Sequence, residues 1–180
     1  MPNGIEAVNI KGFKQANMQI KDNQSMVFDG IMATTPTWKD IEFIRKNTKL
    51  PLILKGITHP SYAKKAIEFG VDGIVVSNHG GRVLDTLVTT MDILPKIVEV
   101  VDNKIPILLD GGIIRGTDIL KALALGASAV MIGKPIMYGL ATAGALGVAH
   151  SLKILKDELE ISMALTGCKT LKDISKDILF

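Results

Sequence analysis

The stretch Gly73-Ile74-Val75-Val76-Ser77-Asn78-His79-Gly80-Gly81-Arg82 decides the fold class of this 180-residue chain. After Gly73 come three β-branched residues in a row, followed by a glycine-rich polar segment with one histidine and one arginine. A continuous apolar run without polar alternation is typical of a strand buried on both faces, and such strands belong to parallel sheets. The stretch therefore predicts a buried parallel strand that ends in a polar loop.

Further apolar runs of the same kind cover residues 50–55, 105–110 and 129–133. Between the runs, apolar residues recur at helical spacing. This predicts helices over roughly residues 38–44, 63–67, 91–101 and 119–123, and a later helix over residues 151–165 that Gly167 ends. Strands and helices alternate, so the sequence predicts four consecutive βα units of a parallel α/β fold.

The helix boundaries carry signals of their own. Thr37 and Thr117 precede helical runs as N-caps, while Gly70 and Gly126 stand where a left-handed residue would end a helix. The apolar segment 136–149 is rich in alanine and glycine and too short to span a bilayer, which favours a helix buried in the core.

The length of the chain limits how these units can assemble. A closed eight-stranded βα barrel needs about 250 residues. The four units therefore form either an open doubly wound sheet or half of a barrel whose other half is absent or lies on another chain. Residues 1–36 show no clear periodicity, so we expect an irregular leader over 1–36 before the βα region of 37–180.

Composition excludes several classes of protein. The charges are interspersed and sum to only +3, which argues against nucleic acid as a partner. Cys168 is the only cysteine, which excludes an internal disulfide and a cysteine-rich metal centre, and we expect no metal site. No apolar stretch is long enough for a transmembrane segment. A cytoplasmic protein is the simplest expectation.

The candidate chemistry lies at the carboxyl ends of the predicted strands, which is where βα folds place their active sites. Lys55 ends one strand and could stabilise negative charge. His79 offers a general base near neutral pH, and Arg82, three residues later, offers a bidentate clamp for a carboxylate. These positions together indicate an enzyme site at one rim of the sheet.

The last two strand ends suggest an anion site. Paired glycines at Gly111 and Gly112 would let backbone amides approach a phosphate, and a helix that starts near Thr117 would direct its dipole there. Arg115 or Lys134 could add charge. The alternative is that these glycines only make tight turns.

The motif from Ser77 to Asp85, followed by Asp110 to Asp118 and Lys121 to Ala127, closely resembles the FMN-dependent α-hydroxy acid oxidase and dehydrogenase family. That family includes glycolate oxidase and L-lactate dehydrogenase. The likeness runs from about Thr37 to Ile178. It implies a (βα) half-barrel derived from the TIM barrel, with four parallel βα units and C-terminal helices, as the C-terminal half of the family barrel.

The resemblance implies a role for each site residue. Lys55 would sit beside the N1 and O2 edge of the flavin and stabilise negative charge there, and Ser77 would contact the flavin ring. His79 would be the active-site base, and Arg82 would hold the substrate carboxylate. The residues that would hold the ribityl phosphate of FMN are Asp110, Gly111, Gly112, Ile113, Ile114, Gly133 and Lys134.

The sequence also departs from the family pattern. Ile114 and Lys134 stand where the family usually has arginines for the phosphate, and Val83 replaces a common glutamine. Lysine is a point donor where arginine is a planar fork, so we expect weaker FMN binding. The likeness starts just before the fifth strand of the family barrel, so the aspartate that orients the catalytic histidine is expected outside this chain.

Two functional hypotheses follow. The first is FMN-dependent oxidation of a small L-2-hydroxy acid, with L-lactate preferred, to the 2-keto acid. The second is a non-catalytic half-barrel, a remnant or binding module that associates with itself through its sheet edges. Whether the chain alone is an enzyme stays open at this point. The expected partners are the hydroxy acid, a second copy of the chain or a complementary N-terminal half. The expected location is the cytoplasm or the periphery of the inner membrane.

Overall fold

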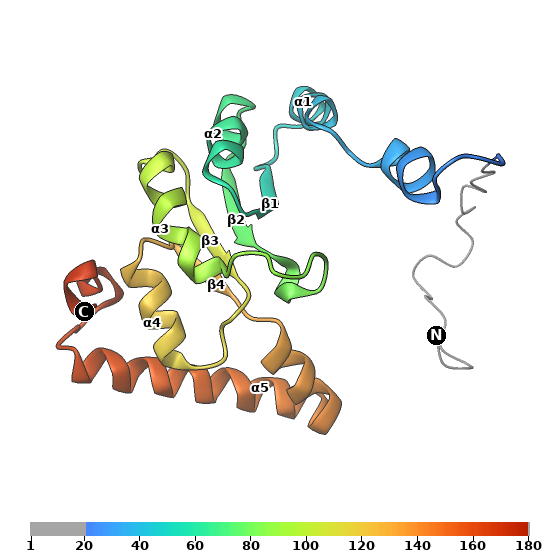
Figure 1. The fold of residues 1–180 in the computed structure, drawn as a ribbon. Helices are drawn as coiled ribbons and strands as arrows, with labels where there is room; N and C mark the ends of the chain where they lie inside the picture. Colours follow the sequence, from blue (N-terminus) through green and yellow to red (C-terminus); the bar gives the residue numbers. More distant parts are fainter. Residues whose placement is uncertain (1–20, 180) are drawn as a thin grey trace. The chain divides into compact units, whose positions relative to one another are not determined.

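The structure is a computed structural model that describes residues 21–179 (Figure 1). The chain divides into two compact units, with the boundary between Ile41 and Glu42. Before the boundary lie a π-helix, η2 (Met26–Ile31), and a 3-10 helix, η3 (Met32–Thr34). Helix α1 (Trp38–Asn47) contains the boundary. Part of the expected leader, residues 1–20, lies outside the described residues, and the leader itself stays a prediction.

The second unit is built on one four-stranded parallel sheet. Its strands lie in the order β1-β2-β3-β4, and every neighbouring pair is parallel. The strands are β1 (Ile53–Ile57), β2 (Gly73–Ser77), β3 (Ile107–Asp110) and β4 (Ala129–Met131). The prediction of four parallel βα units in chain order is confirmed, and this order is that of a half-barrel rather than of a doubly wound sheet.

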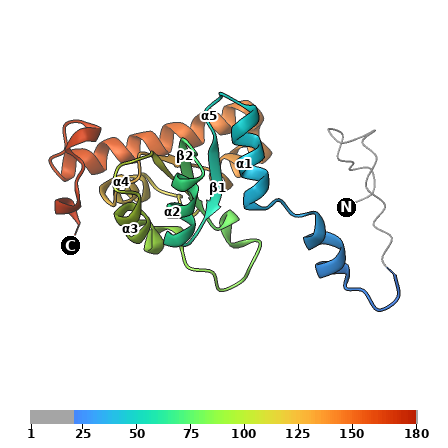
Figure 2. The same cartoon turned by 90° about the horizontal axis from the view of Figure 1, so that it is seen from above.

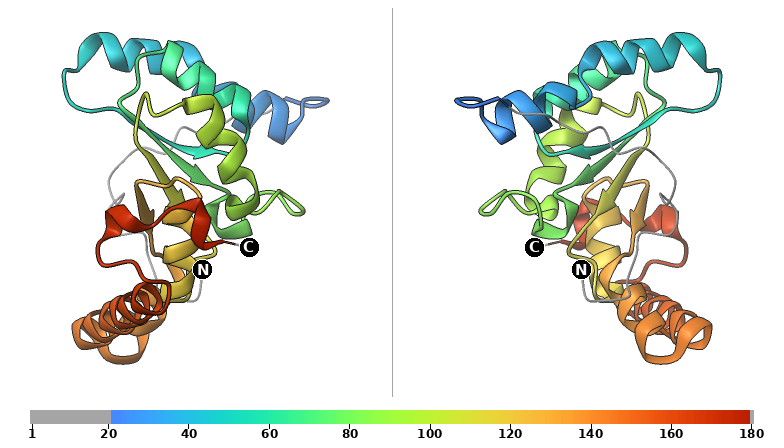
Figure 3. Two further views of the ribbon diagram at one scale, coloured as in Figure 1. Left: turned by 90° about the vertical axis from the view of Figure 1, so that its left-hand side faces the viewer. Right: turned by 90° about the vertical axis from the view of Figure 1, so that its right-hand side faces the viewer.

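The helices after the strands cover one face of this sheet (Figure 3). Helix α2 packs on β1, α3 packs on β2 and β3, and α4 packs on β4. The helices are α2 (Pro60–Glu68), α3 (Thr90–Val101) and α4 (Gly116–Ala124). The core lies between the two layers, and its largest fully buried side chains are Ile74, Leu94, Ile97, Leu109, Val76 and Val101.

Glycines end the first and third of these helices as predicted. Gly70 follows α2 with φ +70°, and Gly126 follows α4 with φ +103°. A Cβ on Gly126 would lie only 2.8 Å from the Cγ1 atom of Val98, so both backbone conformation and packing require glycine there.

The predicted N-cap at Thr117 is wrong. Helix α4 begins at Gly116, its N-cap is Arg115, and Thr117 lies inside the helix. The Asp118 carboxylate accepts hydrogen bonds from the backbone N–H groups of Ile114 at 3.0 Å and of Arg115 at 2.8 Å. Both donors bond the same oxygen of the negatively charged carboxylate, which is favourable at a helix N-terminus, so Asp118 fixes the start of the helix.

The longest helix, α5 (Lys134–Leu165), is interrupted and folds back on itself (Figure 2). Ala143 and Gly144 leave helical geometry, with Gly144 at φ +57°. The backbones of Gly139 and Gly147 then lie in direct contact. There is no room for a side chain between them, since a Cβ on Gly147 would overlap the carbonyl oxygen of Gly139. Two short 3-10 turns follow α5, η5 (Leu171–Asp173) and η6 (Lys176–Ile178).

This hairpin overturns the expectation that residues 136–149 form part of the core. Met137, Tyr138 and Leu146 are 60%, 67% and 80% exposed. The small residues of the segment let its two arms approach each other, and the large apolar side chains are left outside. No helix in the described part of the chain has the length and hydrophobicity that a membrane crossing requires.

The close approach of α4 to α5 predicts a stability effect at Gly116. A Cβ there would overlap the backbone of Glu158 and Leu159. We expect Gly116→Ala to lower the free energy of unfolding by roughly 2–4 kcal/mol, because packed backbones cannot separate without losing other contacts. Gly133→Ala is the matched control, since a Cβ at Gly133 meets nothing within 4 Å. Urea unfolding measures both, and equal stabilities of the two variants would contradict the packing.

Candidate active site

Three side chains from three neighbouring strands meet near the carboxyl ends of β2 and β3. Lys55 was expected to end its strand but lies in the middle of β1, and Ser77 and Asp110 are the last residues of β2 and β3. The Lys55 ammonium lies 3.0 Å from the Ser77 hydroxyl oxygen and 2.7 Å from Asp110 Oδ2. The Ser77 hydroxyl donates to the same Asp110 oxygen at 2.6 Å. Ser77 and Asp110 are also direct partners in the β2–β3 register. Lysine, serine and aspartate therefore form a closed triangle across β1, β2 and β3.

A bulge in β1 accompanies the placement of Lys55. The pairing with β2 shifts register between Lys55 and Ile57, and Gly56 between them has φ +101°. A bulge bends its strand and changes the direction of neighbouring side chains, and a positive φ here requires glycine. The Lys55-Gly56 pair thus acts as one unit, in which the glycine permits the bend beside the lysine.

The charges of the triangle support one another. Burial raises the pKa of Asp110, but the hydrogen bonds from Lys55 and Ser77 outweigh it and hold the pKa below its ordinary value. The positive charge of Lys55 also lowers the pKa of Asp110. Asp110 is therefore a carboxylate near neutral pH, and its negative charge holds the Lys55 ammonium at the rim.

The loop after β2 carries the predicted base and the predicted clamp. It turns through η4 (His79–Gly81), and the His79 amide N–H donates to the Ser77 hydroxyl oxygen at 3.1 Å. His79 has φ +55°, in the left-handed region that few residues other than glycine occupy. Its side chain and that of Arg82 are exposed at the rim. The backbone of His79 thus joins the triangle, while the Arg82 guanidinium makes no ion pair among the described residues.

The loops after β3 and β4 present open backbone. Gly111 and Gly112 have φ +99° and +76°, and a Cβ at Gly112 would meet nothing within 4 Å. Within residues 21–179, the amide N–H groups of Gly112, Ile113 and Gly133 donate no hydrogen bond. Free amides on a glycine-rich loop suit a phosphate.

A lysine lies between two of these loops. The Lys134 ammonium donates to the carbonyl oxygen of Gly80 at 3.3 Å, which links the loop after β4 to the loop after β2. Ile114 is 64% exposed and adds no charge. Lys134 is therefore a cationic group at the rim beside these loops. A cation and free amides are groups of the kind that bind a phosphate.

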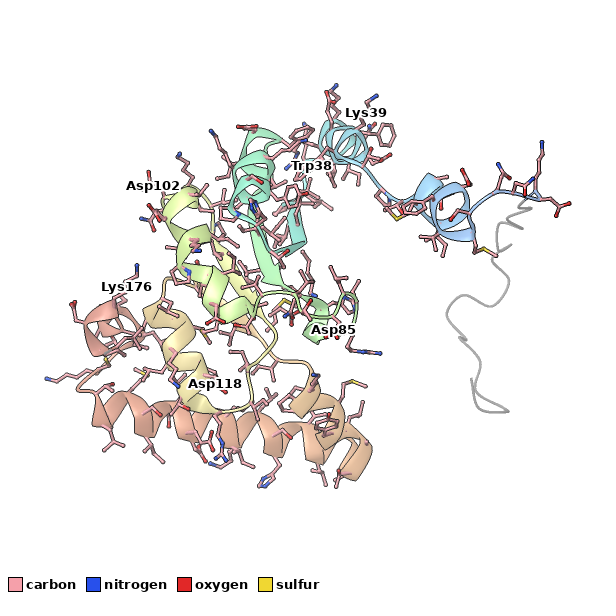
Figure 4. All side chains as sticks on the ribbon, viewed as in Figure 1. Trp38, Lys39, Asp85, Asp102, Asp118 and Lys176 are labelled. Carbon is pink, nitrogen blue, oxygen red and sulfur yellow. The ribbon has the colours of Figure 1, made fainter. Side chains whose placement is uncertain are left out.

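Helix α4 does not give its amides to this cradle. Asp118, at the start of the helix (Figure 4), occupies the N–H groups of Ile114 and Arg115, and Glu158 on α5 accepts from Gly116 at 2.8 Å. These three amides are therefore already bonded to carboxylates, and the expectation that the helix dipole serves an anion stays a prediction. The three-residue spacing from Arg115 to Asp118 signals this cap, but nothing near Gly116 in sequence points to Glu158.

Nothing in the described range gathers three or more histidine, cysteine, aspartate or glutamate side chains in a position to hold a metal ion. The site is thus made of one ion pair, one buried hydroxyl, an exposed histidine and arginine, and a cradle of free amides.

The lowered pKa of Asp110 predicts a pH dependence of stability. A group whose folded pKa is depressed contributes stability above its unfolded value, near 3.8, and loses it as the pH falls through the folded value. Asp110→Asn should lower the free energy of unfolding at pH 7 by about 1–3 kcal/mol and flatten its decline at acid pH. Unfolding curves from pH 2 to pH 7 test this, and an unchanged acid limb in Asp110→Asn would contradict it.

Comparisons with known proteins show the family of this chain. The family model of FMN-dependent dehydrogenases matches residues 2–180. A peroxisomal (S)-2-hydroxyacid oxidase of Arabidopsis thaliana is 56% identical over 78% of this chain and 39% of its own length. The 2-hydroxyacid oxidase of Dictyostelium discoideum is 44% identical over 100% of this chain and 46% of its own length.

A third relative, an L-lactate oxidase of Nostoc, is 44% identical over 99% of this chain and 50% of its own length. Among solved structures, mandelate oxidase in a variant with a monooxide FMN adduct superposes with a TM-score of 0.74 at 47% identity, over 76% of this chain and 44% of that one. The chain spans about half the length of the curated relatives it matches or somewhat less. On the family match and these identities together, the chain belongs to the FMN-dependent dehydrogenase family.

Proposed function

We propose that this chain supplies one side of an active site that oxidises an L-2-hydroxy acid to the 2-keto acid with FMN. The observation that supports the proposal is the triangle of hydrogen bonds between Lys55, Ser77 and Asp110. It lies at the rim of the half-barrel, where the Ser77 hydroxyl also accepts a hydrogen bond from the His79 backbone amide. The relatives are named for oxidation of 2-hydroxy acids, lactate and mandelate, which supports this substrate class. Within it, L-lactate is the substrate we propose.

The substrate is recognised by its carboxylate and its hydroxyl. The exposed Arg82 guanidinium offers two parallel N–H donors to the carboxylate. The His79 imidazole accepts a proton from the substrate as the alcohol carbon becomes a ketone. Oxidation of the hydroxy acid releases two electrons and two protons in total, and His79 takes one of those protons.

When bound, FMN would supply the acceptor for the two electrons and for the second proton of the oxidation. On this chain the Lys55 ammonium, held by Asp110, offsets the negative charge at the flavin edge. The free amides of the glycine loops and the Lys134 ammonium hold the phosphate. The proposed cofactor set therefore comprises Lys55, Asp110, Gly111, Gly112, Ile113, Ile114, Gly133 and Lys134.

We assign this site to residues 37–180, and propose that a second copy of the chain or a complementary N-terminal half completes the barrel. Strands β1 and β4 each pair on one side only within the described sheet. Ile53 and Met131 on these edge strands are 50% and 38% exposed. We propose the cytoplasm as the compartment, although the Arabidopsis relative is named as peroxisomal.

The absorption spectrum of the purified chain tests the proposed function. Bound FMN should give yellow protein, and L-lactate should bleach its visible band. A chain that purifies without flavin, takes up none and shows no bleaching would be the non-catalytic half-barrel instead. Arg82→Leu is the matched control, because it should retain the yellow colour and lose the bleaching.

The open edges of the sheet predict association. Unpaired apolar strand edges recruit another strand or cause aggregation. Light scattering across a dilution series should therefore show a dimer, a complex or poor solubility. A stable monomer that resists dilution would count against the proposed partner.

The departures at the phosphate loops predict a gain of affinity. Ile114→Arg combined with Lys134→Arg should tighten FMN binding roughly 10- to 150-fold per restored charge-assisted contact of about 1.5 to 3 kcal/mol. Arg82→Ala should leave the affinity nearly unchanged, because that side chain is assigned to the substrate. Flavin fluorescence titration measures all three proteins. No gain in the double arginine variant, or a large loss in Arg82→Ala, would show that the phosphate site is misplaced.

A further inference from the structure

We propose that Thr90 is a positioning residue of the proposed phosphate site, and that its buried hydroxyl directs the backbone amide of Gly112 toward the bound phosphate. Thr90 is the first residue of α3, which follows β2, whereas Gly112 belongs to the loop after β3. The inference rests on the proposed function, because it concerns how one donor of that phosphate site is held.

A hydrogen bond joins Thr90 to the loop after β3. The Thr90 hydroxyl donates to the carbonyl oxygen of Gly111 at 3.1 Å, across 21 positions of the chain. Thr90 is 3% exposed. A buried hydroxyl without a partner is costly, so this bond is favoured and holds the Gly111 carbonyl against the start of α3.

The same bond fixes the peptide plane between Gly111 and Gly112. No cis peptide bond occurs in the described residues, and in a planar trans peptide the C=O and the following N–H point in opposite directions. Because the Gly111 carbonyl points to Thr90, the N–H of Gly112 points away from Thr90. Gly112 is exposed, and its N–H donates no hydrogen bond within residues 21–179. The amide is therefore available to a ligand at the rim.

This peptide plane needs an anchor because glycines flank it. Gly111 and Gly112 have φ +99° and +76°. Glycine adopts many backbone conformations at little cost, so a plane between two glycines can turn over unless something holds it. A Cβ on Gly111 would lie 3.6 Å from Thr90 Oγ1 and 3.2 Å from Asn78 Oδ1. Both side chains lie close to Gly111, and the Thr90 hydroxyl sets which way the plane faces.

The anchor itself is rigid. Thr90 is β-branched and part of a helix, which leaves its side chain few rotamers. Helix α3 packs on β2 and β3, and its residues Leu94 and Ile97 are fully buried. A hydrogen bond to a carbonyl also polarises the peptide group and makes its N–H a better donor. Thr90 thus both directs and strengthens the Gly112 amide.

The first test uses the ligand-free chain. Thr90→Val keeps the shape of the side chain and removes its hydroxyl. In this variant the NMR order parameter of the Gly112 amide should fall from the rigid range, about 0.85, toward about 0.6. Thr90→Ser keeps a hydroxyl and should restore the rigid value. An order parameter in Thr90→Val equal to that of the parent chain would overturn the inference.

Thr89→Val is the matched control. Thr89 is the N-cap of the same helix, and its hydroxyl accepts from the Asp92 amide at 3.2 Å and donates to the Asp92 carboxylate at 2.7 Å. Removing this hydroxyl weakens the start of α3 and leaves the bond from Thr90 to Gly111 in place. The Gly112 order parameter should stay as in the parent chain, which separates positioning of the loop from a general loss of stability.

Titration with FMN and with riboflavin tests what the directed amide does. The two ligands differ by the phosphate alone, so the ratio of their dissociation constants reports on the phosphate site. Thr90→Val should weaken FMN binding about three- to tenfold and leave riboflavin binding unchanged, as the loss of one directed hydrogen bond predicts. Thr90→Ser and Thr89→Val should keep the ratio of the parent chain.

The outcomes separate this inference from the proposed function. If the parent chain prefers FMN and Thr90→Val keeps the same ratio, Thr90 does not act on the phosphate donors and the inference is overturned. If the parent chain binds no FMN or shows no preference for it, the proposed phosphate site fails. The order parameters then still decide whether Thr90 holds the amide of Gly112.

Discussion

The ion pair between Lys55 and Asp110 is the interaction on which the candidate site depends. It joins β1 to β3 across the end of β2, so two strands that do not touch in the sheet are held at a fixed separation. The Ser77 hydroxyl at the end of β2 makes a hydrogen bond with each of them. Because the lysine is partly exposed and the aspartate is more buried, the pair keeps a positive group facing the rim. A charge held in this way needs little reorganisation when a negative cofactor arrives.

The phosphate end of the site is built differently. Asp118 and Glu158 take the amides at the start of α4, which stabilises the contact between α4 and α5 but removes those donors from any anion. What remains is the glycine backbone after β3 and β4 and the ammonium of Lys134. A phosphate bound here, as we propose, would depend on loop conformation more than on charge. Ile114 supplies no charge to the proposed phosphate site, whereas an arginine at this position would add a positive charge to the hydrogen bonds of the backbone amides.

The sequence predicted the strands and the rim well because both follow from local chemistry. Buried parallel strands appear as apolar runs, and glycines with positive φ mark turns such as Gly70 and Gly126. The sequence failed where tertiary contact decides the outcome. The segment 136–149 is apolar enough for a core, yet the backbone contact of Gly139 with Gly147 turns it into an exposed hairpin. Glu158 lies 42 residues from Gly116, whose amide N–H donates to it, and no local sequence pattern predicts such a pair. The resemblance to the family identified the rim residues, and the geometry adds that the Ser77 hydroxyl joins Lys55 to Asp110.

The most direct test of a flavin nucleotide site at this rim compares FMN with riboflavin, which differs from it only by the phosphate. Fluorescence titration of the intact chain with each ligand gives two dissociation constants under the same conditions. The glycine loops and Lys134 predict that FMN binds at least about tenfold more tightly than riboflavin, and that added salt narrows the difference. Equal affinity for the two ligands would contradict the phosphate cradle, and with it the assignment of this rim to FMN.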